Sequence, residues 1–86
     1  MLDAEKLTER IRSALPGAEV KVVDLKGTGD HFEARVVSSA FEGCSMIEQH
    51  RMVYAPLQDW LSTGELHALA LKTYTPEQWK KSGGAG

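Results

Sequence analysis

Two histidines, His31 and His67, are the residues of this 86-residue chain whose type and spacing best fit metal chemistry. Neutral imidazole is a good ligand for iron, zinc and copper. Two side chains are too few for a closed structural zinc site, which takes four protein ligands. The pair is therefore either two unrelated surface histidines or half of a metal site whose other ligands come from a second molecule.

The strands that the sequence predicts would bring these two histidines together. Strands are expected over residues 18–26 and 31–38, joined by a short loop that makes them an antiparallel hairpin. A third strand follows a long helical connection, which is the form of a right-handed crossover between parallel neighbours. Parallel neighbours begin at the same edge of a sheet. His31 opens the second strand and His67 the third, so both imidazoles are expected at one rim.

The stretch from Gly64 to Pro76 is predicted to be a central or near-central strand. It begins at a glycine that can end a helix and stops at a Thr-Pro pair that opens another. Between these breakers the run is apolar, with polar members at His67 and Lys72. Such a run is typical of a strand with both faces covered.

The first helix is expected over residues 3–15. A second runs from Ser45 to about residue 54, and a third continues to about residue 62 after a break at Pro56. The last helix begins at Thr75. Ser45 and Thr75 are followed three residues later by Glu48 and Gln78, the pattern of a capping box. The order α-β-β-α-α-β-α predicts an α+β fold with a three-stranded mixed sheet and helices packed on it. Residues 1–81 are expected to be one domain and residues 82–86 a flexible tail.

Composition narrows the function classes. The net charge is −2, so a nucleic-acid surface would have to be a local basic patch. The chain has no apolar run of membrane-spanning length, and its first residues lack the pattern of a signal peptide. One cysteine fits a reducing compartment, so a cytoplasmic location without membrane attachment is expected. There is no phosphate-binding glycine loop, nucleophile elbow or HExxH motif, which favours a binding or carrier module over an enzyme.

Three further residues are weaker candidates. His50 and Arg51 lie on the predicted helix after Ser45 and are either ordinary helix residues or phosphate contacts, with nearby Glu48 reducing the local positive charge. Cys44 directly precedes the same helix, but no histidine is obviously paired with it, so a catalytic role is the less favoured reading.

Several short motifs, weak one by one, occur together between Leu7 and Trp79. They are Gly27 to Phe32 (GTGDHF), Val36 to Ser38, Phe41 to Gly43, Gln49 to Tyr54, Leu57, and His67 to Trp79. In combination they resemble the BolA family. The resemblance implies a fold similar to class II KH domains and a monothiol glutaredoxin of the CGFS type as partner. It also implies a shared [2Fe–2S] cluster, ligated by the glutaredoxin cysteine, a glutathione thiol and histidine.

The resemblance assigns roles to particular residues. His67 matches the C-terminal histidine ligand of the family, and His31 matches the second ligand, which lies in the loop before the second strand. No cluster is expected on the isolated chain, which would be a monomer or weak homodimer.

The family is also described as DNA-binding transcription regulators that use the helical region, here residues 44–54 with His50 and Arg51 as possible contacts. Two positions depart from the nucleic-acid pattern: the GxxG loop is absent at residues 43–46, and Gln49 replaces a basic residue.

Overall fold

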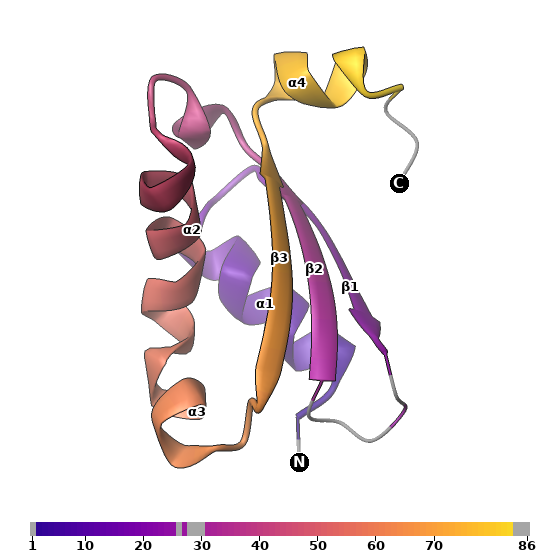
Figure 1. Ribbon diagram of the computed structural model, residues 1–86, viewed down its shortest axis with the longest axis vertical. Helices are drawn as coiled ribbons and strands as arrows, with labels where there is room; N and C mark the ends of the chain where they lie inside the picture. The colour runs from indigo at the N-terminus through magenta and orange to yellow at the C-terminus, as the bar shows by residue number, and fades with distance from the viewer. Residues whose placement is uncertain (1, 26, 28–30, 84–86) are drawn as a thin grey trace.

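The computed structural model describes residues 2–25, 27 and 31–83, and it has the predicted order of helices and strands (Figure 1). Predictions for Lys26, for the loop residues 28–30 and for tail residues 84–86 lie outside this range. Ser82 and Gly83 form a turn after the last helix. The elements are α1 (Ala4–Ala14), β1 (Glu19–Asp24), β2 (His31–Val37), the short 3-10 helix η1 (Ser39–Phe41), α2 (Met46–Tyr54), the 3-10 helix η2 (Ala55–Leu57), α3 (Gln58–Thr63), β3 (Ala68–Tyr74) and α4 (Pro76–Lys81).

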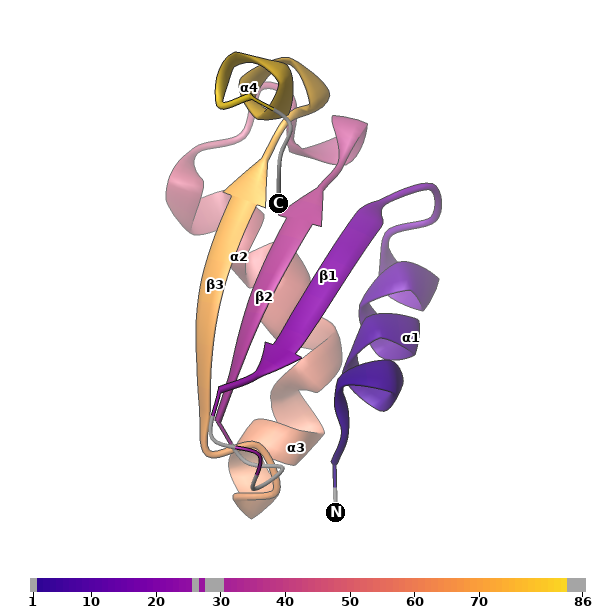
Figure 2. The same cartoon turned by 90° about the vertical axis from the view of Figure 1, so that its right-hand side faces the viewer.

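The three strands form one mixed sheet in the order β1-β2-β3 (Figure 2). The β1–β2 pair is antiparallel and the β2–β3 pair is parallel, as the hairpin and the crossover predicted. His31 lies opposite Ala68, the residue that follows His67. The predicted relation between the two histidines is therefore built into the register of the sheet.

The prediction that β3 is a central or near-central strand with both faces covered is wrong, because β3 is an edge strand of the sheet, with β2 in the centre. Along β3 the burial alternates: Leu69 and Leu71 are half-buried, whereas Ala68 and Ala70 are exposed. The continuous apolar run suggested two covered faces, but alanine is small enough to be left exposed at little cost. One face of β3 packs on the helices and the other is open.

The helices α1, α2 and α3 all lie on one side of the sheet, and the other side is uncovered (Figure 1). The β2 residues that point to the helical side, Phe32, Ala34 and Val36, are almost fully buried. The core comprises Leu2, Leu7, Ile11, Leu15, Ala18, Phe32, Ala34, Val36, Phe41, Val53, Leu57 and Leu66. Each described helix is too short to cross a bilayer as an apolar span.

Both predicted capping boxes are present. The Ser45 N–H donates to a Glu48 carboxylate oxygen at 3.0 Å, and the Glu48 N–H donates to the Ser45 hydroxyl at 3.2 Å. Thr75 and Gln78 make the same reciprocal pair at the start of α4. These bonds fix where α2 and α4 begin, since they satisfy backbone donors that have no partner inside a helix.

Candidate metal centre

The structure brings His31 and His67 together at one rim of the sheet. Their ring centroids are 5.7 Å apart, and the ring planes are within 16° of parallel. His67 is exposed and His31 is half-buried. The two imidazoles are thus neighbours on a surface that another molecule can reach.

His67 is positioned by the turn between α3 and β3. Helix α3 ends at Gly64, whose φ of 83° is in the left-handed region that favours glycine. Two residues later Leu66 is almost fully buried, and its N–H donates to the Trp60 carbonyl at 3.0 Å. His67 therefore stands between a buried anchor and the first residue of β3, so its backbone has little freedom.

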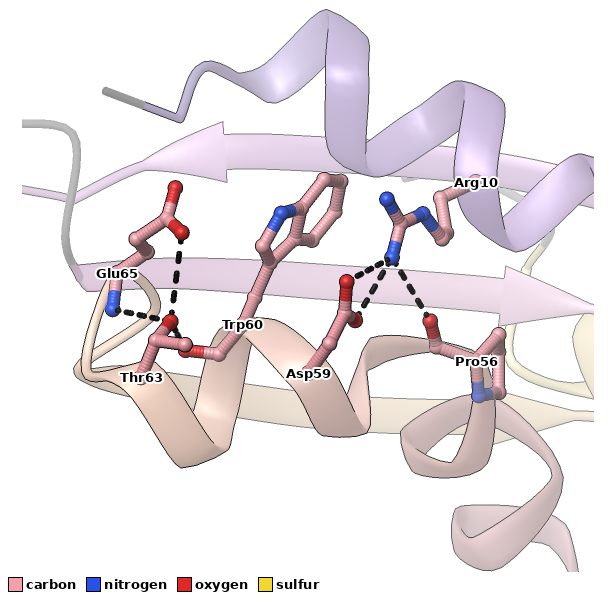
Figure 3. A network of polar contacts seen from close by, with 6 residues as sticks. All are labelled: Arg10, Pro56, Asp59, Trp60, Thr63 and Glu65. Atoms are coloured by element: carbon pink, nitrogen blue, oxygen red, sulfur yellow. Dashed lines mark hydrogen bonds and ion pairs between the residues drawn. The ribbon is translucent and has the colours of Figure 1, made fainter.

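Helix α3 is itself held against α1 by a group of polar and aromatic contacts around Arg10 (Figure 3). The guanidinium of Arg10 donates to the Asp59 carboxylate at 2.8 and 3.0 Å and to the Pro56 carbonyl at 3.3 Å. It also lies 3.7 Å from the centroid of the Trp60 ring, in cation–π geometry. The hydrogen bond from Arg10 lowers the pKa of Asp59. This contact group connects α1 to the segment that leads into His67.

His31 is held by the sheet on both sides. Its carbonyl accepts from the Leu25 N–H at 2.9 Å, which continues the β1–β2 pairing. On the other side it is in register with Ala68 of β3. Its backbone is thus fixed by pairing with both neighbouring strands.

The donor set at this rim is incomplete for a metal. In residues 2–25, 27 and 31–83, no three His, Cys, Asp or Glu side chains gather closely enough to hold an ion. Two imidazole nitrogens suit iron or another transition metal, but such ions take four or more ligands. A metal at this rim would need further ligands from outside the described chain.

The other predicted candidates lie on α2. His50 is half-buried and packs edge-on against Tyr54, with ring centroids 6.3 Å apart, and it is not part of the stacked pair. Arg51 is exposed. Cys44, before the helix, is half-buried, with its sulfur 3.7 Å from the Ala40 carbonyl oxygen. Of these three residues, only Arg51 projects freely into solvent.

Gln49 has a structural role that the sequence analysis missed. It is 4% exposed, its amide nitrogen donates to the Cys44 carbonyl at 3.0 Å, and its amide oxygen accepts from the Thr73 hydroxyl at 2.8 Å. A side chain held in this way cannot contact a nucleic acid. The signal was available in the spacing, because Gln49 lies four residues before the buried Val53, on the same face of α2.

The chain is a small α+β domain with two stacked histidines at one rim, and comparison with known proteins places it in a family. The family model described as "BolA-like protein" matches residues 6–78. The chain therefore belongs to the BolA-like family. It is 40% identical over 82 residues to Protein BOLA2 of Arabidopsis thaliana, covering 93% of this chain and 86% of that protein.

Two other similarities agree with this assignment. The chain is 37% identical over 87 residues to the DNA-binding transcriptional regulator BolA of Escherichia coli K12, covering 93% of this chain and 82% of that protein. The crystal structure of a Bol-like protein from Babesia bovis superposes with a TM-score of 0.83 at 30% identity, covering 96% of this chain and 95% of the other. The mixed sheet and its helices are thus those of solved BolA-like structures.

Proposed function

We propose that this chain is a non-enzymatic adaptor that binds a CGFS-type monothiol glutaredoxin and co-ligates a [2Fe–2S] cluster with it and glutathione. Its role would lie in iron–sulfur cluster assembly, trafficking or iron regulation. His67 is the principal ligand and His31 the second. The observation that carries the proposal is the pair of near-parallel imidazoles, 5.7 Å apart, at an accessible rim.

The chemistry of the donor set fits a shared cluster. Iron–sulfur clusters are usually held by thiolates, and histidine replaces two of them in Rieske centres. The single cysteine, Cys44, packs beside Ala40 on the segment before α2, so the thiolates would come from the glutaredoxin and glutathione. Histidine ligation tends to raise the reduction potential of such a cluster relative to all-thiolate ligation.

The rim that carries His31 and His67 is also preorganised for binding. The backbone at each histidine is fixed, at His31 by two neighbouring strands and at His67 by the buried Leu66. Fixing ligands before binding lowers the ordering cost when a second protein adds its own. His67 is the more exposed of the two rings, which supports its role as the principal ligand.

The test is co-expression with a monothiol glutaredoxin in the presence of glutathione, followed by size-exclusion chromatography and visible absorption spectroscopy. We expect a coloured heterocomplex whose spectrum changes in His67→Ala. His50→Ala is the matched control, since it removes the same ring from α2 and should leave the spectrum as in the wild type. An unchanged spectrum in His67→Ala would remove that residue from the cluster.

A second candidate function, DNA-binding regulation through α2, has support from one relative, because the Escherichia coli protein is named a DNA-binding transcriptional regulator. In this chain exposed Arg51 is the residue of α2 best placed to contact phosphate, while Gln49 is occupied internally. Duplex DNA should be titrated at two salt concentrations with wild type and Arg51→Ala. Salt-dependent binding that Arg51→Ala weakens supports regulation, and absence of binding near physiological salt contradicts it.

A further inference from the structure

The outer edge of β3 has backbone groups that face away from the sheet. The Tyr74 carbonyl accepts from the Ser38 N–H at 3.0 Å, so Tyr74 and alternate residues before it face β2. The remaining residues, Leu69, Leu71 and Thr73, face outward. An independent contact agrees, since the hydroxyl of Tyr54 donates to the Leu69 carbonyl at 3.2 Å from outside the sheet.

Beyond the carbonyl that Tyr54 satisfies, this edge is open. Within the part of the chain that the structure describes, the outward N–H and C=O groups of Leu71 and Thr73 have no hydrogen-bond partner. Strand β3 contains no proline, which would block pairing at an edge. The edge is therefore a template on which one more strand could pair.

A groove of about 330 Å³ runs along this open stretch. Its walls are Met46 and His50 of α2 and residues 71–74 of β3. Met46, in the first turn of α2, is 56% exposed. A strand paired with β3 would place alternate side chains in the groove beside Met46.

Basic residues on the uncovered face of the sheet favour an added strand with acidic side chains. Lys21, Arg35 and Lys72 lie in one cross-strand row, in register across β1, β2 and β3. Like charges on directly opposed residues destabilise a sheet. Glu33 is a carboxylate that pairs with this row, at 3.6 Å from Arg35 and 3.8 Å from Lys72. The row ends at the open edge with Lys72, so a carboxylate on an added strand would lie beside an incompletely neutralised cation.

We propose that the edge of β3 binds an extended segment of a partner protein, in which apolar and acidic residues alternate, as a fourth strand of the sheet. Main-chain hydrogen bonds to Leu71 and Thr73 supply the pairing. The apolar side chains lie in the groove beside Met46, and the acidic ones lie on the open face beside Lys72. This site uses neither His31 nor His67 and is separate from the proposed cluster rim.

The probe is a fluorescein-labelled heptapeptide of alternating valine and glutamate, titrated into the full chain and followed by fluorescence anisotropy and NMR amide exchange. On saturation, we expect exchange of the Leu71 and Thr73 amides to slow. Exchange of the Ala70 and Lys72 amides, which already face β2, should not change. Uniform slowing along β3, or no slowing, overturns the proposal.

Two variants test the charge requirement. Lys72→Glu turns an attraction into a repulsion and should weaken binding about tenfold, and a valine–lysine peptide should restore it. Lys21→Glu makes the same change in the same row on the far strand and should bind like wild type. Equal weakening by both variants contradicts pairing at β3. A second outcome also contradicts the proposal: a single-stranded oligonucleotide slows exchange of the Leu71 and Thr73 amides and the peptide does not. The edge of β3 would then bind nucleic acid.

Discussion

The ring of His31 stacks on the ring of His67, with 5.7 Å between the centroids, although the two residues belong to different strands. The stacking follows from parallel pairing, in which His31 is opposite Ala68 and both strands begin at the same edge. Neither side chain needs a partner molecule to reach this position. The proposed ligands are thus already adjacent in the isolated chain.

The proposed cluster is expected to be acid-sensitive. A protonated imidazole cannot bind metal, so protons compete with iron for the ring nitrogens of the ligating histidines. The visible absorption of the complex with glutaredoxin should therefore fall as the pH is lowered below neutral. Circular dichroism of the isolated chain over the same range is the control, and should not change. Absorption that does not fall before the isolated chain itself unfolds in acid would contradict histidine ligation.

The buried contact between Thr73 and Gln49 is expected to stabilise the packing of α2 on β3. Thr73→Val keeps the shape of the side chain but leaves the Gln49 amide oxygen without its donor at 2.8 Å. A buried acceptor without a partner costs about 1–3 kcal/mol, which urea denaturation should show as a lower free energy of unfolding.

Thr63→Val is the matched control for this change, because the Thr63 hydroxyl makes its hydrogen bonds to the Trp60 carbonyl and to Glu65 at an exposed position, where water can replace them. Its free energy of unfolding should stay within about 0.5 kcal/mol of wild type. If both variants lower the free energy of unfolding by similar amounts, the Thr73–Gln49 hydrogen bond stabilises the fold no more than the exposed hydroxyl of Thr63 does.

The rim could be predicted from the sequence because local signals and a general rule of topology sufficed. The short loop before His31 indicated a hairpin, and the helical connection before His67 indicated a parallel crossover. The capping residues Ser45 and Thr75 likewise marked where two helices begin. Each of these inferences depends on residues that are close together in the chain.

Other features depended on partners far apart in the sequence and were not predicted. The spacing from Val53 could have placed Gln49 on the buried face of α2, but not its hydrogen-bond partner Thr73, which lies 24 positions away. The edge position of β3 was missed because Ala68 and Ala70 counted as apolar residues that need covering, whereas in the fold they are exposed. Which face of a strand is covered depends on where helices pack, and short apolar runs do not encode it.

The ion pair between Arg10 and Asp59 should make stability depend on pH. The hydrogen bond from Arg10 lowers the pKa of Asp59 below its ordinary value of 3.8. A carboxyl group with a lowered folded-state pKa contributes stability above its unfolded pKa and loses that contribution as the pH falls through the folded one. Asp59→Asn should therefore be less stable than wild type at neutral pH, and the difference should shrink at pH values below 3.8.

Thermal unfolding of the two proteins at neutral and acid pH measures this difference. Glu9→Gln, which neutralises the carboxylate next to Arg10 in the chain, is the control. The difference in Tm between Glu9→Gln and wild type should be about the same at both pH values. If the difference in Tm between Asp59→Asn and wild type does not depend on pH, the charge of Asp59 contributes nothing to stability.

Gly64 is expected to matter for the path of the chain into His67. Its φ of 83° is in the left-handed region, and a Cβ atom placed on it would meet nothing within 4 Å. Gly64→Ala should therefore lower the free energy of unfolding by about 1–2 kcal/mol through backbone strain alone, without a steric clash. Gly64→Asn should recover part of the loss, because asparagine tolerates this conformation better than alanine. Equal stability of the alanine and asparagine variants in urea denaturation would show that the left-handed conformation of Gly64 does not limit stability. In that case the position of His67 would depend on the burial of Leu66 instead.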